Sequence, residues 1–329
     1  MAEIAIIGSG GFGLSLALLC HNKGHKVTVW SKFKDEIDTI LRTGELKAKL
    51  PGVIIPKDIK LTTDISCVFG KDLIVVGIPS AFVRSVCTEA ALHIDSKTIV
   101  VSTAKGLEEG TFKRMSEVVS ECMPDNTVVA LTGPSHAEEV ARGIPTTIVA
   151  ACDDIEAAKY VQSELSGNNM RIYVSDDAVG CEIGGALKNI IALAAGICDG
   201  LGYGDNTKAA LMTRGMREIS RLGLKLGGKL ETFYGLTGMG DMIVTCTSMH
   251  SRNRRAGILI GKGVKPADAI RQVGTVEGYF CTKTAHELSK KVGVSMPIVN
   301  ELYDVLEYGK DVNISLSELM LRPYVSENN

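Results

Sequence analysis

A single charged residue stands inside a long apolar stretch of the chain. The segment GGALKNIIALAAGIC covers residues 184–198, and Lys188 carries its one charged side chain. On a helix, Lys188 shares a face with small residues three, four and seven positions away, namely Gly184, Gly185, Ala192 and Ala195. Small neighbours leave room for another backbone or a flat ring, and burial lowers the pKa of an ammonium group. Lys188 is therefore a candidate for proton transfer near neutral pH, unless it reaches the surface or pairs with a buried acid for structural reasons.

A second segment, GMGDMIVTCTSMHSRNRR at residues 238–255, combines an acid with an anion-binding pattern. Asp241 follows its glycines, two threonine hydroxyls come next, and a basic cluster ends it. Ser251 can cap a helix that begins at Arg252, where an anion would meet free backbone amides, Arg252 and Asn253. A solvated helix face is the ordinary alternative, and the formal net charge of −2 argues against a nucleic-acid surface.

The glycine loop near the N-terminus reads GSGGFG and matches G-x-G-x-x-G. It follows an apolar strand pattern and opens a helical pattern, which is the context that dinucleotide binding requires. Gly8 would make the tight turn, Gly10 would let the backbone approach a pyrophosphate, and Gly13 would let helix and strand pack closely. The amides near Gly11 and Phe12 would face the phosphates. A glycine-rich turn without a ligand is the alternative.

The end of the second predicted strand, KVTVW, bears on the choice between NADH and NADPH. A carboxylate there would hold the 2′-hydroxyl of the ribose. The strand instead ends in Trp30, Ser31 and Lys32, with no acid at its tip. Because Lys32 and Ser31 could bind a 2′-phosphate, we expect NADPH to be favoured and NADH to be accepted. A surface role for Lys32 is the alternative.

Three more loops follow predicted strands, and the carboxyl ends of strands form the ligand crevice of such a sheet. GIPS places Pro79 at this edge, STAKG places Lys105 there, and TGPSHAEE follows the fifth strand. In the last loop, Ser135 and Glu138 fit the capping box S-x-x-E. That box would give Ser135 a structural reason to be present, so a ligand role for it stays open.

Two kinds of structure must position these residues. Near-continuous apolar runs predict strands at 3–8, 26–30, 72–78, 98–102, 127–131, 146–151 and 171–175. Helical patterns between several of them lie at 12–23, 80–92, 111–122 and 135–142. After Asp177 helical patterns dominate, at 178–199, 206–226, 252–261, 266–273, 279–292 and 298–309. We expect an α/β fold in which a doubly wound, Rossmann-type parallel sheet domain at 1–177 precedes an all-α domain at 178–329.

Composition excludes several classes of protein. The 329 residues are 45% hydrophobic and 22% charged, an ordinary globular composition, and with a formal net charge of −2 no global basic field draws the chain to nucleic acid or to an anionic membrane. The nine cysteines form no C-x-x-C pair, which argues against zinc and disulfides and favours a reducing cytoplasm. The start lacks a basic signal-peptide region, and the run at 183–198 is shorter than the ~20 residues that a bilayer needs. We expect a soluble cytoplasmic protein that uses no metal and binds small molecules. A homodimer is compatible with the sequence.

The chain resembles NAD(P)-dependent glycerol-3-phosphate dehydrogenase of the bacterial type. The segments that carry the resemblance run in order over essentially the whole chain: IGSGGFG, STAKGLE, TGPSHAEE, GGALKNIIALAAGICDGLGYGDNTKAALMTRG, GMGDMIVTCTSMHSRNRRAG and VEGYFCTK. The resemblance implies interconversion of dihydroxyacetone phosphate and sn-glycerol 3-phosphate with NADPH or NADH, which supplies glycerophospholipid synthesis.

The resemblance also implies roles for individual residues. Lys188 would be the proton donor and acceptor, Lys105 would touch both coenzyme and substrate, and Asp241 would orient the reacting groups. The substrate positions would be Lys105, Gly133, Ser135, Lys188, Asn189, Asp241, Ser251, Arg252 and Asn253. Besides the glycine loop, Ser31, Lys32 and Pro79, the cofactor positions would be Lys105, Ala137, Arg252, Thr275 and Glu277. Gly11 and Thr275 depart from the family pattern, which usually has a small polar and an aliphatic residue there.

Two other functions fit parts of this pattern. A reductase of another small keto acid, of the 2-ketopantoate or β-hydroxyacid type, would share the nucleotide domain and a lysine on a helical domain. It would not require the anion site in HSRNRR. A non-catalytic dinucleotide sensor would not need Lys188, Lys105 and Asp241 together.

Overall fold

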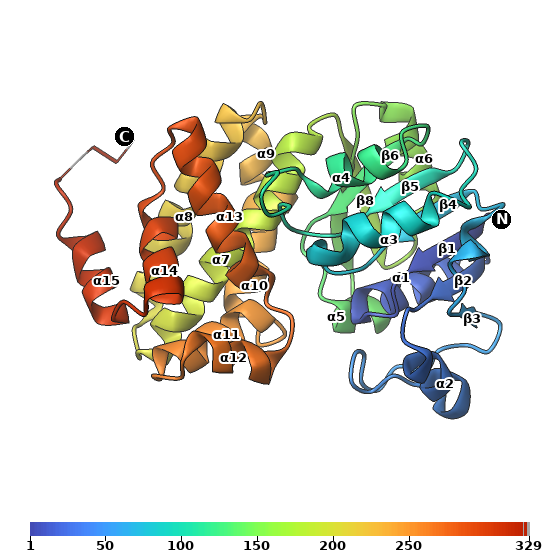
Figure 1. Ribbon diagram of the computed structural model, residues 1–329, viewed down its shortest axis with the longest axis horizontal. Coiled ribbons are helices and arrows are strands. Elements are labelled where there is room, and N and C mark those ends of the chain that lie inside the picture. The colour runs from blue at the N-terminus through green and yellow to red at the C-terminus, as the bar shows by residue number, and fades with distance from the viewer. Residues whose placement is uncertain (325, 328–329) are drawn as a thin grey trace.

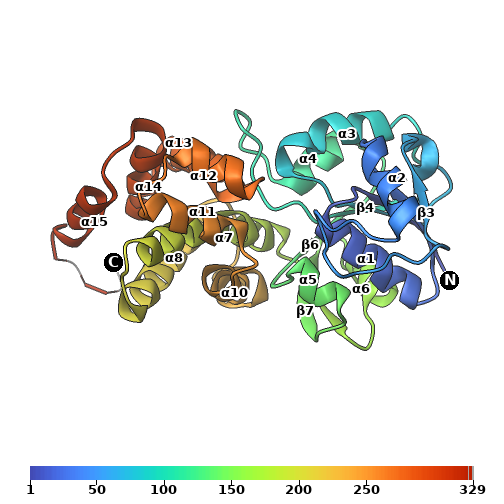
Figure 2. The same ribbon diagram turned by 90° about the horizontal axis from the view of Figure 1, so that it is seen from below.

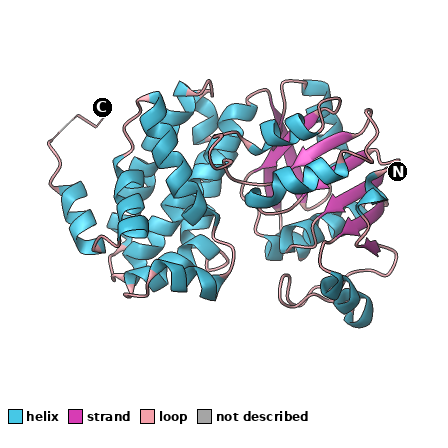
Figure 3. Ribbon diagram, in the orientation of Figure 1, coloured by secondary structure: helices cyan, strands magenta, loops and turns pink. Residues whose placement is uncertain are grey.

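The chain folds into a half built around a β-sheet and a half built from helices, which lie side by side (Figure 1). This computed structural model describes residues 1–324 and 326–327. Strands are confined to the N-terminal half (Figure 3). The last strand ends at Ser175 and the first helix of the helical half begins at Ala178.

The sheet has eight strands in the order β3-β2-β1-β4-β5-β6-β7-β8. Their bounds are β1 Glu3–Ile7, β2 Lys26–Trp30, β3 Lys60–Thr62, β4 Leu73–Val76, β5 Ile99–Ser102, β6 Val128–Thr132, β7 Thr146–Ala151 and β8 Met170–Ser175. The part from β3 to β6 is parallel and has the strand order of a dinucleotide-binding sheet, as expected. However, β6 and β7 pair antiparallel, so β7 and β8 run the opposite way and the sheet is mixed. The sequence prediction also missed the short strand β3.

Strand β1 shows why the sheet is apolar on both faces. Ile4 and Ile6 belong to one core, whereas Ala5 and Ile7 belong to another, because successive side chains of a strand point to opposite faces. Helices cover both faces: α1 Gly11–Asn22, α2 Lys34–Thr43, α3 Val83–Ala90, α4 Met115–Cys122, α5 Ala137–Ala141 and α6 Ile155–Leu165. Figure 2 shows α3 and α4 on one side of the sheet and α1 and α6 on the other. Helices α2 and α6 were not predicted.

Helix α7, Ala178–Gly200, is the core of the helical half. A Cβ added at Gly196 would lie 2.1 Å from the carbonyl oxygen of Arg254, so this glycine lets α7 and α11 meet backbone to backbone. By length and composition α7 could cross a membrane, yet 94% of its most apolar window is buried inside the protein. It is therefore packed as the core helix of a globular unit.

The other helices of this half surround α7 (Figure 1). They are α8 Asp205–Lys225, α9 Leu230–Tyr234, α10 Asp241–Thr247, α11 Arg252–Gly261, α12 Pro266–Val273, α13 Glu277–Val292, α14 Pro297–Tyr308 and α15 Val312–Met320. One turn of π-helix, Leu236–Gly240, leads into α10. The prediction placed α7, α8 and α11–α14 to within two residues and missed α9, α10 and α15.

A hairpin-like loop leads from β5 to α4 and contacts both halves. Leu107 bridges to Arg114 within it, so the helix expected from residue 111 begins only at Met115. Leu107 is buried in the core of the helical half, and Phe112 packs against that core. Lys105 lies at the start of this loop, so the contacts that hold the loop also fix the position of Lys105.

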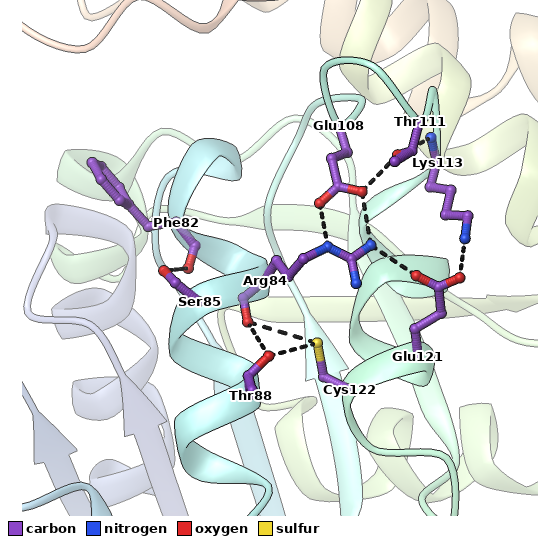
Figure 4. A network of polar contacts seen from close by, with 9 residues as sticks. All are labelled: Phe82, Arg84, Ser85, Thr88, Glu108, Thr111, Lys113, Glu121 and Cys122. Atoms are coloured by element: carbon purple, nitrogen blue, oxygen red, sulfur yellow. Dashed lines mark hydrogen bonds and ion pairs between the residues drawn. The ribbon is translucent and has the colours of Figure 1, made fainter.

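An arginine of α3 fixes the other side of the same loop. The Arg84 guanidinium donates to Glu108 at 2.7 and 2.8 Å and to Glu121 of α4 at 2.7 Å (Figure 4). A bidentate guanidinium–carboxylate pair fixes geometry better than a single contact does. The loop after β5 is thus held by the sheet half as well as by the helical half.

Candidate active site

The glycine loop between β1 and α1 forms a cradle that side chains would fill. Gly8 has φ of 120°, and a Cβ there would lie 2.6 Å from the carbonyl oxygen of Gly77. A Cβ at Gly13 would lie 2.2 Å from the carbonyl oxygen of Gly8. Helix α1 begins at Gly11, and its N-cap, Gly10, has no side chain to satisfy the first backbone amides. Those amides and the helix dipole suit a pyrophosphate, so the loop fits the dinucleotide expected from its sequence.

Gly11 departs from the family pattern, and the packing around it explains the absence of a side chain. A Cβ at Gly11 would lie 2.7 Å from the carbonyl oxygen of Lys49 and 3.3 Å from the Cβ of Ala137. The segment that carries Lys49 therefore lies directly over the glycine loop. The same contact brings Ala137, a predicted cofactor position, next to that loop.

A carboxylate does lie at the tip of β2, contrary to the sequence reading. The hydroxyl of Ser9 is 2.7 Å from that of Ser31, and both donate to Glu36, which reaches back from α2; the Ser31 contact measures 3.1 Å. Both serines are buried, whereas Lys32 is exposed. The sequence reading missed Glu36 because it lies on the next helix, five residues after Ser31.

Two lysines and one aspartate form the charged centre of the molecule, here called the lysine–aspartate cluster: Lys105, Lys188 and Asp241. Asp241 accepts from Lys105 Nζ at 2.6 Å and from Lys188 Nζ at 3.0 Å, using a different oxygen for each. Lys188 also donates to the Thr245 hydroxyl at 2.6 Å, and Lys105 to the carbonyl oxygen of Gly133 at 2.8 Å. The loop after β5, helix α7 and the start of α10 thus meet at one carboxylate.

Burial and neighbouring charges set the protonation of this cluster. Lys188 is 5% exposed, and burial lowers its pKa to about 8, with Asp241 opposing the shift and the charge of Lys105 adding to it. Burial alone would raise the pKa of Asp241, but the two ammonium groups outweigh it and hold that pKa below its usual value. Asp241 therefore stays ionised, while Lys188 can release a proton near neutral pH.

The space left by the small residues beside Lys188 is filled mainly by other elements of the protein. A Cβ at Gly185 would lie 2.6 Å from the Thr132 hydroxyl at the end of β6, and one at Gly184 would lie 3.0 Å from the carbonyl oxygen of Thr237. These glycines let β6 and the π-helical turn approach α7. The Thr132 hydroxyl is buried and has no hydrogen-bond partner among the described residues, which leaves it free for a ligand.

The loop after β6 does not form the predicted capping box. Helix α5 begins at Ala137, its N-cap residue is His136, and no side chain caps it. The Ser135 hydroxyl donates instead to the carbonyl oxygen of Gly133, at 3.0 Å, and that oxygen also accepts from Lys105. The prediction was wrong because the helix starts one residue later than a capping box of Ser135 and Glu138 requires.

His136 is a further neighbour of the cluster that the sequence reading passed over. Burial, and next the charge of Lys188, lower the pKa of His136. Its Nε2 is buried and has no hydrogen-bond partner within residues 1–324 and 326–327. The only sequence signal was a histidine beside a predicted ligand residue.

Asn189 and Asn253 hold helices together. Asn253 Nδ2 donates to Asn189 Oδ1 at 2.9 Å, and the Gly278 amide donates to Asn253 Oδ1 at 2.8 Å. These bonds join α7, α11 and α13, and both asparagines are buried. These two asparagines therefore join the helices beside the predicted substrate site, and neither bond uses Asn189 Nδ2, whose two donor hydrogens could serve a ligand.

The predicted anion site at the start of α11 has the expected local geometry. Ser251 caps α11, accepting from the Arg254 amide at 3.2 Å, and the helix begins at Arg252 as predicted. The Arg252 side chain is exposed and forms no ion pair within the described part of the chain. It is free to meet an anion.

Glu277, at the start of α13, reaches the sheet half. The Ser80 hydroxyl donates to it at 2.6 Å and the Ser80 amide at 3.2 Å. Burial raises the pKa of Glu277 against the lowering effect of Ser80. Pro79 precedes this serine, Thr275 lies half-buried just before α13, and a Cβ at Gly106 would lie 2.7 Å from Ser80 Cβ. The predicted cofactor positions Pro79, Lys105 and Glu277 thus converge.

Comparisons with known proteins agree with this geometry. The family model described as NAD-dependent glycerol-3-phosphate dehydrogenase N-terminus matches residues 3–158, and the one described as its C-terminus matches residues 177–317. A relative from Clostridium perfringens named glycerol-3-phosphate dehydrogenase [NAD(P)+] is 50% identical over 324 residues, covering 98% of each chain. The crystal structure of glycerol-3-phosphate dehydrogenase from Coxiella burnetii superposes with a TM-score of 0.94 at 36% identity, covering 98% of this chain and 99% of that one.

A solved ketopantoate reductase resembles this chain more distantly. The protein from Ralstonia eutropha has a TM-score of 0.63 at 15% identity, covering 96% of this chain and 99% of that one, so it shares the fold alone. Among the described residues, no group of three or more His, Cys, Asp or Glu side chains could hold a metal ion.

Both family models match this chain in order, and a relative at 50% identity spans it. The chain therefore belongs to the NAD-dependent glycerol-3-phosphate dehydrogenase family.

Proposed function

We propose that this protein interconverts dihydroxyacetone phosphate and sn-glycerol 3-phosphate with NADH or NADPH. The observation that carries the proposal is the lysine–aspartate cluster, a buried acid shared by two ammonium groups, in a chain whose relatives are named glycerol-3-phosphate dehydrogenase [NAD(P)+]. The alcohol product would supply the backbone of glycerophospholipids.

The sheet half supplies the residues that would hold the coenzyme. The amides at the start of α1 would bind the pyrophosphate, and Ser31 would lie near the adenosine ribose. Pro79, Lys105, Ala137, Arg252, Thr275 and Glu277 would line the remainder of the coenzyme site. The bound coenzyme supplies the hydride.

The cluster would manage the charge and the proton of the reaction. As negative charge grows on the ketone oxygen, Lys188 donates a proton to it and Lys105 stabilises it electrostatically. Asp241 holds both ammonium groups in position, and Thr245 fixes Lys188 from the other side. In the reverse direction, neutral Lys188 accepts the proton of the alcohol.

The start of α11 would hold the substrate phosphate away from the reacting carbon. Free amides behind Ser251 and the exposed Arg252 guanidinium suit a phosphate. Binding a remote group positions the ketone and contributes to the rate. The Gly133 and Ser135 region would line the substrate site through its contact with Lys105.

One assay tests the proposed reaction. NADH and NADPH oxidation are followed separately with dihydroxyacetone phosphate and with unphosphorylated dihydroxyacetone. We expect turnover with the phosphorylated ketone and little with the other. Equal turnover with both ketones, or turnover only with an unrelated keto acid such as 2-ketopantoate, contradicts the proposal.

Arginine variants test the phosphate site separately. Arg252→Ala should raise KM for dihydroxyacetone phosphate by roughly 10–100-fold, the loss expected for a hydrogen bond to a charged group. Arg255→Ala, an exposed arginine on the same helix, is the matched control and should leave KM unchanged. An unaltered KM in the Arg252 variant removes this arginine from the substrate site.

We infer a dinucleotide-binding domain at 1–177 and a catalytic helical domain at 178–329, in a cytoplasmic protein. All nine cysteines are free thiols, which suits a reducing compartment. A homodimer is proposed because apolar side chains such as Ile314 and Met320 are exposed on α15. A mass near 35.1 kDa by light scattering would contradict it.

A further inference from the structure

The carboxylate at the tip of β2 sits where the adenosine ribose of a dinucleotide would bind. In a sheet of this type the pyrophosphate occupies the glycine loop and the ribose lies beside the end of the second strand. Ser9 belongs to the glycine loop and Ser31 follows β2, and the hydroxyls of both donate to Glu36. One carboxylate thus marks the junction of pyrophosphate and ribose positions.

The local charge at this junction is well defined. The Glu36 side chain is 19% exposed, and its one cationic partner within ion-pair distance in the described residues is Lys49, at 3.8 Å. Lys49 lies on the segment that covers Gly11. Lys32, the residue that suggested a 2′-phosphate site, is exposed and makes no ion pair with Glu36 within residues 1–324 and 326–327.

We propose that Glu36 is the residue that selects NADH over NADPH, by accepting a hydrogen bond from the ribose 2′-hydroxyl and repelling a 2′-phosphate. A phosphate carries nearly two negative charges at neutral pH, and like charges a few ångström apart repel strongly where solvent is partly excluded. Lys49 compensates one charge at most. The proposal rests on the proposed coenzyme use and reverses the preference for NADPH that Ser31 and Lys32 suggested.

Direct binding of coenzyme, without dihydroxyacetone phosphate, tests this selection. The chain has one tryptophan, Trp30, which is buried at the end of β2 next to Ser31, so its fluorescence should report binding. We expect the dissociation constant for NADPH to exceed that for NADH by about tenfold or more. In Glu36→Gln the two constants should approach each other, chiefly through tighter NADPH binding.

Two further variants separate selection from general effects of charge or folding. Asp38→Asn removes a carboxylate from the same helix that pairs only with Lys34 in the described structure, and should leave the ratio unchanged. Lys49→Gln should raise the ratio, because the partial compensation of Glu36 is lost. Unfolding temperatures of all variants show whether any of them is misfolded.

The outcomes distinguish this inference from the proposed function. Wild-type protein that binds NADPH as tightly as NADH, or a ratio unaffected by both Glu36→Gln and Lys49→Gln, overturns the role of Glu36. If coenzyme binding behaves as expected but dihydroxyacetone phosphate is not reduced, the selection stands and the proposed reaction fails.

Discussion

The two ends of the site are built from different materials. The glycine loop, Gly8 to Gly13, depends on its backbone and has no room for side chains at its two ends. A Cβ at Gly8 or at Gly13 would lie within 2.6 Å of a carbonyl oxygen. The lysine–aspartate cluster is made of three charged side chains, and its aspartate is only 2% exposed. The glycine loop can bind a ligand because no side chain fills it. The lysine–aspartate cluster can act on a substrate because its charges are held close together and largely away from water.

This difference determines how each end should fail. A backbone-built site fails through steric conflict, which affects binding and packing but changes no charge. A charge-built site fails through loss of a proton or of a counterion, which affects rate and pH dependence.

The largest effect is expected from removing the ammonium group of Lys188. Lys188→Ala should lower kcat by roughly 10²–10⁴, the usual contribution of a general acid, while coenzyme affinity changes little. Lys188→Arg keeps the charge but cannot release a proton at ordinary pH, so it should be similarly slow. Rescue of kcat by arginine would show that the lysine acts only as a buried cation.

Neutralising the shared carboxylate comes next. Asp241→Asn leaves the buried Lys188 and the partly buried Lys105 without their shared counterion and should cost about 3–5 kcal/mol of unfolding free energy, measured by denaturant titration. It should also move the pH profile of ketone reduction to lower pH, because Asp241 opposes the lowering of the Lys188 pKa.

Asp199→Asn is the matched control for that variant. Asp199 also lies between two cations, with Lys208 at 2.6 Å and Arg254 at 2.7 Å, but outside the cluster. It should lower stability and leave the pH profile in place. A profile that moves equally in both variants would contradict a specific role for Asp241.

The backbone-built end should respond to a single methyl group. Gly8→Ala places a Cβ 2.6 Å from a backbone oxygen at φ of 120°, and should weaken NADH binding by about 1–3 kcal/mol through overpacking and strain. Gly24→Ala, at φ of 90° but with nothing within 4 Å, controls for strain alone. Calorimetry that finds the same NADH affinity in both variants would remove the steric argument.

The smallest effect, a pH dependence, should come from the charged end alone. Ketone reduction needs protonated Lys188, whose pKa is about 8, so kcat for reduction should fall as pH rises through that value. Alcohol oxidation needs the neutral amine and should rise over the same range. Each direction should change by up to about tenfold per pH unit on its falling side. Parallel profiles in the two directions would argue against Lys188 as the proton carrier.

The contrast between the two ends also explains what could be predicted from the sequence. The glycine loop is local, since its strand, turn and helix are consecutive, and its residues lie where the pattern placed them. Ser251 at the start of α11 was equally local and was correct. Continuous apolar strands were found within about two residues of their ends because burial on both faces leaves a simple pattern.

Contacts between distant segments could not be derived in this way. Lys105 and Asp241 are 136 positions apart, and no local signal states that they share a hydrogen bond. Glu36 was missed because a helix turns it back toward β2. The reversed direction of β7 and β8 was missed because pairing direction leaves little trace in an apolar run. Ser135 and Glu138 match the capping-box motif in sequence, yet the Ser135 hydroxyl donates to the carbonyl oxygen of Gly133 and does not cap the helix. A local motif alone therefore does not fix the contacts of its side chains.

The loop after β5 has a mechanical consequence. It is clamped to α3 by Arg84, embedded in the helical half by Leu107, and carries an amine bonded to both sides. A wide hinge between the halves would have to detach this loop from one of them, by breaking either its contacts with Arg84 and Gly133 or its contacts with Asp241 and the helical core. Because either separation breaks several contacts, we expect ligands to exchange through small local motions that leave Lys105 and Lys188 in place.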